Sequence, residues 1–206
     1  IAAAVAEGVA QAHKETRMAA RATRVSAINE TGIRMLSATD VAEVTRLATS
    51  SLAMILDADH AILRLQDPDT RRYGICSYFG TADDQLQQKL FALDKRISVE
   101  AIKRRTAFLV RDLAQRSELA EHADDFRSLI AAPLKQDGQV IGTLAIYDKI
   151  AIDRFFPGRF SDDDLQILAK FVSYAERAIA NARVHAEAGE QRNFDLETGL
   201  PNASYF

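Results

Sequence analysis

The side chains with the most potential for chemistry are one cysteine and four histidines. Cys76 is the only cysteine in the sequence, so the chain can form neither an internal disulfide nor a cluster of thiolates that would bind a metal. His13, His60, His122 and His185 are scattered, without the spacing of a metal or catalytic site. The sequence also lacks a glycine-rich phosphate loop, an H-E-x-x-H motif and a G-x-S-x-G motif. We therefore expect no catalytic residues and no metal ligands within this chain.

Two of these residues still allow a functional and a structural interpretation. Cys76 lies in the run GICSYF, which predicts a strand, and a small buried apolar residue is a commoner role there than redox or chromophore chemistry. His122 stands alone, and a haem or metal role would need a second ligand that no spacing supplies. We interpret Cys76 as structural and keep His122 as a candidate contact for a small ligand.

Composition narrows the class of protein. Of the 206 residues 48% are hydrophobic, which suffices for one core with long helices attached. The formal net charge of -3 gives no general attraction to nucleic acid. No run approaches the about 20 apolar residues that cross a bilayer, and the single cysteine fits a reducing compartment. We expect a cytoplasmic chain without nucleic acid or membrane contacts, and its start within a helical pattern leaves open a membrane segment upstream.

Long helices are expected at both ends. Residues 1–38 are rich in Ala, Glu, Gln and Arg without Pro, which is typical of a signalling or coiled-coil helix. A final helix over residues 161–192 begins with Ser161 as N-cap, followed by three aspartates that suit the positive end of the helix dipole.

The final helix carries two apolar stripes. One stripe keeps a 3-4 repeat and predicts the seam of a parallel homodimer; its residues are Leu165, Leu168, Val172, Ala175, Ile179 and Ala182. Ile167, Phe171 and Ala178 form the second stripe, which would face the domain. The alternative is that both stripes pack within one subunit.

Between the two terminal helices, the spacing of apolar residues changes from a helical repeat to shorter helical and strand patterns. A capping signal at Asp40 predicts a helix to about residue 56, and shorter helices are expected over residues 83–93 and 99–105. Alternating or short apolar runs predict strands over residues 61–65, 73–79, 108–110, 129–134 and 140–147. Asp137-Gly138 is a strong hairpin signal. These elements indicate an α+β fold, with a mainly antiparallel sheet covered by helices and a core over residues 39–160.

Four motifs follow one another between residues 108 and 165: FLVRDL, RSLIAAPL, DGQVIGTLAIYDK and FSDDDLQIL. Together they resemble the GAF family, over about residues 40–182. The matching positions are Asp112, Ser128, Pro133, Leu134, Gly138, Gly142, Phe160 and Ser161. The resemblance implies a sensory domain with a ligand pocket beside the sheet.

The positions around the family's pocket give the candidate contacts for an unidentified small ligand. They are Tyr78, Phe79, Phe108, Asp112, His122, Phe126, Arg127 and Ser128. Arg127 could bind an anion, although a surface ion pair is the commoner role of such a residue.

A degraded signature of cyclic-nucleotide-binding GAF domains is also present. That signature is N-K followed by F-x3-D-E, and this chain has Asp148-Lys149, Phe160 and Asp164, with Leu165 in place of Glu. A helix cap and an ion pair of Lys149 with a nearby carboxylate explain the same residues without a ligand, so we favour the structural interpretation.

The last residues, 193–206, contain DLETGLPNASYF, which resembles the opening segment D-x-L-T-G-L-P-N-R of diguanylate cyclase (GGDEF) domains. The resemblance implies that the catalytic loop, Mg²⁺ and GTP sites lie beyond residue 206. This chain would then be a non-enzymatic input domain that dimerises through its terminal helices and controls synthesis of cyclic di-GMP. The alternatives are a GAF dimerisation scaffold that binds no ligand and the input domain of an inactive GGDEF receptor.

Overall fold

A five-stranded antiparallel sheet forms the centre of the computed structural model, which describes residues 22–151 and 158–193. The strand order is β2-β1-β5-β4-β3, so the two hairpins lie side by side and the short strand closes one edge. This confirms the predicted α+β fold. The strands are β1 (Ala58–Gln66), β2 (Tyr73–Phe79), β3 (Phe108–Val110), β4 (Leu129–Gln136) and β5 (Gln139–Lys149).

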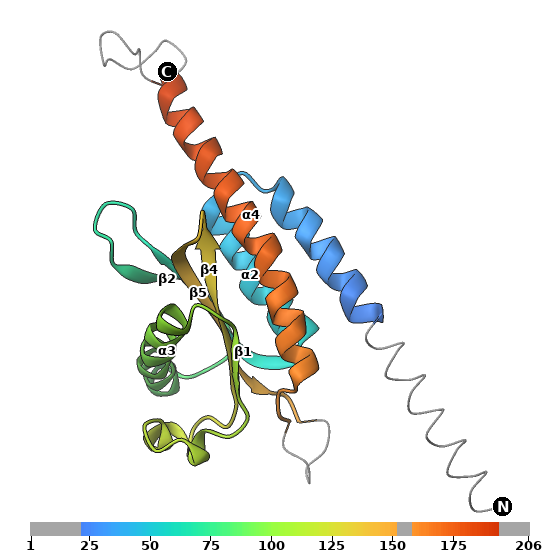
Figure 1. Cartoon of the computed structure of the whole chain (residues 1–206), viewed down its shortest axis with the longest axis vertical. Coiled ribbons are helices and arrows are strands. Elements are labelled where there is room, and N and C mark those ends of the chain that lie inside the picture. Colours follow the sequence, from blue (N-terminus) through green and yellow to red (C-terminus); the bar gives the residue numbers. More distant parts are fainter. Residues whose placement is uncertain (1–21, 152–157, 194–206) are drawn as a thin grey trace, which may run out of the picture.

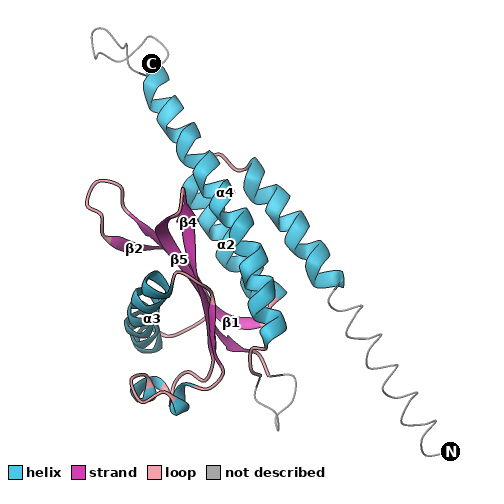
Figure 2. Ribbon diagram, in the orientation of Figure 1, coloured by secondary structure: helices cyan, strands magenta, loops and turns pink. Residues whose placement is uncertain are grey.

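Helices cover both faces of the sheet (Figures 1 and 2). One face carries a helical layer made of residues 22–37, α2 (Val41–Ile55) and α4 (Asp162–Asn193). The other face carries α3 (Asp84–Arg104) and the short 3-10 helices η1 (Leu113–Gln115) and η2 (Ala120–His122). Within the described ranges, no helix combines the length and the apolar character that a membrane crossing needs.

The helix starts follow the predicted capping chemistry. The Asp40 carboxylate accepts a hydrogen bond from the Ala42 amide at 3.2 Å and so caps α2. At the start of α4, Ser161 Oγ accepts from the Asp164 amide at 3.2 Å, and Asp164 Oδ2 accepts from the Ser161 amide at 2.9 Å. This reciprocal pair is a capping box with aspartate in the usual glutamate position, and it fixes where α4 begins.

The β4–β5 hairpin turns at Asp137 and Gly138, as predicted. Both residues have positive φ values, 51° and 75°, which is the backbone conformation of a type I′ turn. Residues 194–206, with the cyclase-like segment, and residues 1–21, with the start of the expected N-terminal helix, lie outside the described residues.

The two short helices expected over residues 83–93 and 99–105 are one continuous helix, α3. The two predicted ranges leave a gap over residues 94–98. Asp94, within that gap, is buried on the same face as Leu90, Ile97 and Ala101, so the buried stripe runs on without interruption at helical spacing.

The predicted dimer seam of α4 is covered within a single chain. Leu168, Ala175, Ile179 and Ala182 have no exposed surface, Val172 is buried and Leu165 is half-buried. The second stripe, with Phe171 at its centre, is buried as well. Both stripes therefore pack against the sheet and the other helices of the same subunit, which is the alternative left open by the sequence. The assignment of the first stripe to an intersubunit seam is corrected accordingly.

A close backbone approach in the sheet gives a stability prediction. A Cβ atom on Gly142 would lie 2.3 Å from the Arg64 carbonyl oxygen, whereas a Cβ on Gly74 would meet nothing within 4 Å. Because backbone cannot yield as a flexible side chain can, Gly142→Ala should lower the free energy of unfolding by about 1–3 kcal/mol. Gly74→Ala, the matched control, should change it by less than about 0.5 kcal/mol. Urea denaturation of both variants measures this, and equal effects would contradict the packing described.

Candidate functional site

The sheet face that packs against α3 carries a row of polar side chains. The rest of the contact between this face and α3 is apolar. Alternation along β1 directs His60 and Arg64 to this face together with Ile62, and β5 contributes Thr143 and Tyr147. All four polar residues are less than one-tenth exposed. Buried polar groups need hydrogen-bond partners, so each of them defines a contact that α3 or a neighbouring strand must complete.

Asp94 of α3 is the centre of this polar row. Its carboxylate forms an ion pair with the Arg64 guanidinium and accepts a 2.7 Å hydrogen bond from the Tyr147 hydroxyl. Arg64 also donates to the Phe91 carbonyl oxygen at 3.3 Å. Burial raises the pKa of Asp94, an effect that Arg64 partly offsets, and burial together with the Asp94 charge raises the pKa of Tyr147. These contacts fix both the position and the rotation of α3 on the sheet.

One turn further along α3, a second polar contact repeats the arrangement. The hydroxyls of Ser98 and Thr143 lie 2.9 Å apart and both side chains are buried. Asp94 and Ser98 are separated by four residues and so share one face of the helix.

A series of ring contacts leads from Tyr147, beside Asp94, toward the edge of the sheet. The Phe126 ring makes edge contacts with Tyr147 and with His60, at centroid distances of 6.5 and 6.3 Å. His60 in turn stacks on Tyr78, and its Nδ1 lies 3.2 Å from the Tyr78 hydroxyl. Desolvation by burial lowers the pKa of His60, and burial raises that of Tyr78, so both groups stay neutral near pH 7.

Three of the predicted pocket residues meet on this face. Phe126 is fully buried, Phe108 is 5% exposed and Tyr78 packs against the same apolar cluster. The structure thus brings together residues from β2, β3 and the segment that precedes β4.

Two further predicted residues carry buried polar atoms without a hydrogen bond. These atoms are His122 Nε2 and Ser128 Oγ, which have no hydrogen-bond partner within the described part of the chain. His122 Nε2 lies 3.5 Å from a carboxylate oxygen of Glu121. Ser128 has no exposed surface. Unsatisfied buried atoms are uncommon in folded proteins.

The remaining predicted pocket residues lie elsewhere. Phe79 packs against the helical layer, because it follows Tyr78 on β2 and adjacent strand residues face opposite sides. Asp112 caps η1 through the Ala114 amide at 3.1 Å and pairs with Arg159 at 3.3 Å. The side chain of Arg127 is exposed. The assignment of these three residues to a ligand pocket stays a prediction.

The residues of the degraded nucleotide signature have structural roles. Lys149 Nζ pairs with Asp164 at 3.0 Å, donates to the Leu56 carbonyl oxygen at 3.0 Å and lies over the Phe160 ring. The Asp148 carboxylate accepts from the amides of Arg127 and Ser128 at 2.7 and 3.0 Å. Burial raises the pKa of Asp148. The predicted pairing of Lys149 with a nearby carboxylate is confirmed.

Cys76 differs from its interpretation as a buried residue, because it is exposed on the edge strand β2. In the part of the chain that the structure describes, no group of three or more His, Cys, Asp or Glu side chains could hold a metal ion. The polar and aromatic side chains of the α3 face offer hydrogen bonds, aromatic contacts and a buried ion pair.

Sequence reasoning missed four residues of this site: His60, Arg64, Asp94 and Tyr147. The alternation of β1, with Ile62 between His60 and Arg64, carried a signal that both polar side chains face one side. The partner Asp94 is 30 residues away, and no local pattern links it to Arg64.

Helices cover both faces of the antiparallel sheet, and the face under α3 carries a buried row of polar side chains. The sequence profile of the GAF domain matches residues 38–180. This match spans more than half of the chain, so the protein belongs to the GAF family, whose domains are regulatory sensors. No curated protein matches the sequence.

Solved structures share this fold at low sequence identity. The GAF domain of an Acinetobacter phosphoenolpyruvate-protein phosphotransferase has 16% identity and a TM-score of 0.59, covering 79% of this chain and 95% of that one. A free methionine-R-sulfoxide reductase from Neisseria meningitidis, in complex with its substrate, has 15% identity and a TM-score of 0.61, with coverages of 80% and 92%. The GAF domain of a putative sensor histidine kinase from Pseudomonas syringae pv. tomato has 15% identity and a TM-score of 0.60, with coverages of 87% and 99%.

The buried ion pair under α3 gives a second prediction. Asp94→Ala leaves the Arg64 guanidinium buried without its carboxylate, and the free energy of unfolding should fall by about 3–5 kcal/mol. The double variant Arg64→Met/Asp94→Leu removes both charges and should recover at least about half of that loss. Chemical denaturation of the two variants tests the pair. A double variant no more stable than Asp94→Ala would show that the charges do not act as a pair.

Proposed function

We propose that this chain is the sensory input domain of a diguanylate cyclase and that α4 carries its signal. The observation that supports this most is the continuity of α4. The helix starts at the capping box of Ser161 and Asp164, is buried against the sheet layer as far as Ala182, and runs on to Asn193. Val184 is already 63% exposed, and the last turns project beyond the sheet (Figure 1).

The sequence that follows α4 supports the choice of output domain. The TGLPN run over residues 198–202 resembles the start of a GGDEF domain. In that family, the segment joins a signalling helix to the catalytic domain. A helix that is packed at its start and projects beyond the sheet at its end can transmit a rotation or shift to whatever follows it.

The signal itself is proposed to be a small molecule bound on the α3 face. Phe126 and Tyr78 supply aromatic surface there, and His122 Nε2 and Ser128 Oγ are buried polar atoms that a ligand with hydrogen-bonding groups would satisfy. A ligand that contacts α3 and the segment before β4 would act on the same sheet that supports α4.

The cyclase family also leads us to propose a homodimer. Two GTP-loaded active sites must face each other to make cyclic di-GMP, so the orientation of the two subunits' α4 helices relative to each other would control the output. GTP and Mg²⁺ would bind only in the cyclase domain.

This proposal is tested by insertions after Ala186 in the full-length protein. Two extra helical residues rotate the cyclase domain by about 200° about the α4 axis, whereas seven extra residues rotate it by only about 20°. Cyclic di-GMP formation from GTP and Mg²⁺ should change at least about fivefold with the two-residue insertion. It should stay close to the parent value with the seven-residue insertion.

The seven-residue variant is the matched control, because it lengthens the helix more and rotates it less. If both insertions leave synthesis of cyclic di-GMP unchanged, α4 does not transmit the signal. If the full-length protein forms no cyclic di-GMP at all, the output domain is not a diguanylate cyclase.

A further inference from the structure

A groove of about 500 Å³ lies where the β1–β2 hairpin meets α2 and α4. Leu65 of β1, Val41 of α2 and Arg183 of α4 contribute to its walls. Leu65 and Val41 pack in the core cluster on the helical-layer side of the sheet, so the groove is separate from the α3 face. It touches α4 where this helix leaves the sheet, because Ala182 is fully buried and Val184 is already 63% exposed.

A glycine on the edge strand β2 keeps this groove open. The register of β1 and β2 pairs Gly74 with Leu65, so both residues face the same side of the sheet. Gly74 lines the groove, and a Cβ atom at this position would meet nothing within 4 Å. Glycine within a strand often marks a place where a ligand or another backbone approaches closely. The missing side chain therefore leaves room for a bound group.

Two arginines border the groove without a carboxylate partner. Arg72 and Arg183 form no ion pair with any residue whose side chain the structure describes. Arg183 donates to the Gln66 carbonyl oxygen at 3.4 Å, and the Arg72 carbonyl oxygen accepts from the Asp67 amide at 2.9 Å. These contacts place both arginines at the same end of the hairpin. Each guanidinium carries five N–H donors, so both retain donors for an anion.

Among the described residues that line the groove, Asp67 alone carries a carboxylate. Its Oδ1 accepts hydrogen bonds from the amides of Asp69 and Thr70, at 3.1 and 2.7 Å, and from the Thr70 hydroxyl at 2.9 Å. This carboxylate is therefore bound within its own turn. Two guanidinium charges against one carboxylate leave the groove with an excess of positive charge.

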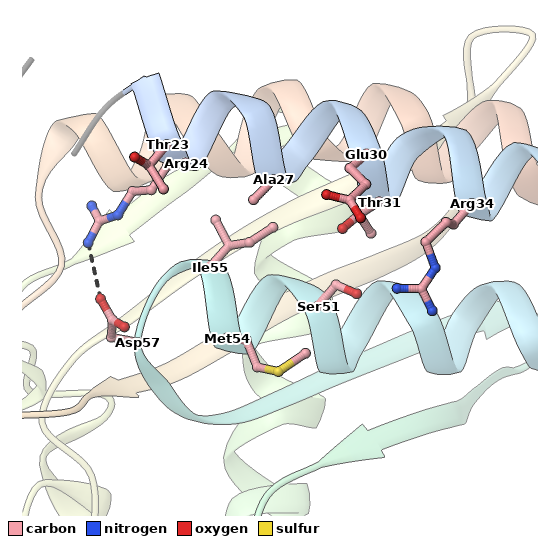
Figure 3. Close-up of a pocket in the computed structure, with 10 residues that line it drawn as sticks. All are labelled: Thr23, Arg24, Ala27, Glu30, Thr31, Arg34, Ser51, Met54, Ile55 and Asp57. Carbon is pink, nitrogen blue, oxygen red and sulfur yellow. Dashed lines mark hydrogen bonds and ion pairs between the residues drawn. The ribbon is translucent and has the colours of Figure 1, made fainter. Parts of the chain in front are cut away.

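The charges differ in the groove of about 550 Å³ between residues 22–37 and α2 (Figure 3). Two arginines and two carboxylates line that groove, and one ion pair, Arg24–Asp57, is closed there at 3.1 Å. Charges that balance within a groove give an anion no advantage. The groove at Gly74 is thus the better suited of the two to an anion.

We propose that the groove at Gly74 binds a small amphipathic carboxylate. The carboxylate group lies between Arg72 and Arg183, and the apolar part lies over Gly74 against Leu65 and Val41. A guanidinium matches a carboxylate with two parallel hydrogen bonds. The volume of the groove falls within the range of small-molecule sites, about 300–1,000 Å³. This site is additional to the α3-face ligand of the proposed function and does not depend on it.

Cys76 makes binding measurable in the 206-residue chain, because it lines the groove, is exposed and is the only cysteine in the sequence. Decanoate is the probe, since it joins a carboxylate to an apolar chain. At saturation it should slow the alkylation of Cys76 by iodoacetamide at least about fivefold. Decanol, which has the same chain without the charge, should bind at least about tenfold more weakly.

Substitutions locate the bound probe. Gly74→Leu fills the hollow without a clash and should abolish protection of Cys76 by decanoate. Arg72→Gln and Arg183→Gln should each weaken decanoate binding at least about tenfold. Arg71→Gln is the matched control, because Arg71 is an exposed neighbour that does not line the groove, and it should change the dissociation constant by less than about twofold. Circular dichroism verifies that each variant is folded.

Four results would overturn the assignment of this groove. Decanoate that does not protect Cys76 shows that the site does not bind it, and protection that survives Gly74→Leu places decanoate elsewhere. Equal protection by decanol shows that the arginines do not recognise the carboxylate. An alkylation rate that falls with protein concentration assigns the groove to a second copy of the chain. Each of these results leaves the proposed function standing, because the α3 face and the continuity of α4 do not depend on the groove.

Discussion

The arrangement of this domain depends on one buried carboxylate, that of Asp164. It accepts hydrogen bonds from the amide and the hydroxyl of Ser161, both at 2.9 Å, and pairs with Lys149 at 3.0 Å and with Arg24 at 3.2 Å. These donors come from the start of α4, from β5 and from the helix of residues 22–37. A buried charge needs such partners to offset its desolvation. Both terminal helices are therefore fixed to the sheet at the same point.

The two faces of the sheet are covered by different elements and differ in their side chains. The α3 face holds the Arg64–Asp94 ion pair and a series of aromatic contacts, and it is the face on which we propose that a small molecule binds. The opposite face carries the three helices that lead into and out of the domain (Figure 2). Strands β1 and β5 supply side chains to both faces. Under the proposed function, a change on the α3 face would reach the helical layer through these two strands.

Local sequence signals were sufficient for much of the fold and for less of the site. Caps at Asp40 and Ser161 and the turn at Asp137-Gly138 involve residues within a few positions of one another, and those predictions were confirmed. The Arg64–Asp94 pair could not be found in this way, because its two members are 30 residues apart on different elements. The stripes of α4 gave the apolar faces correctly but not what covers them, because a heptad repeat fits a helix of the same chain as well as a helix of another.

The central claim is that Asp164 joins both terminal helices to the sheet as one unit. Hydrogen exchange measured by mass spectrometry on the 206-residue chain, comparing the parent with Asp164→Asn, tests it directly. The loss of a charged hydrogen-bonding group should speed exchange by at least about tenfold. We expect this in residues 22–37 and in the first turns of α4 alike, with α3 unchanged. Faster exchange confined to the first turn of α4 would contradict the claim.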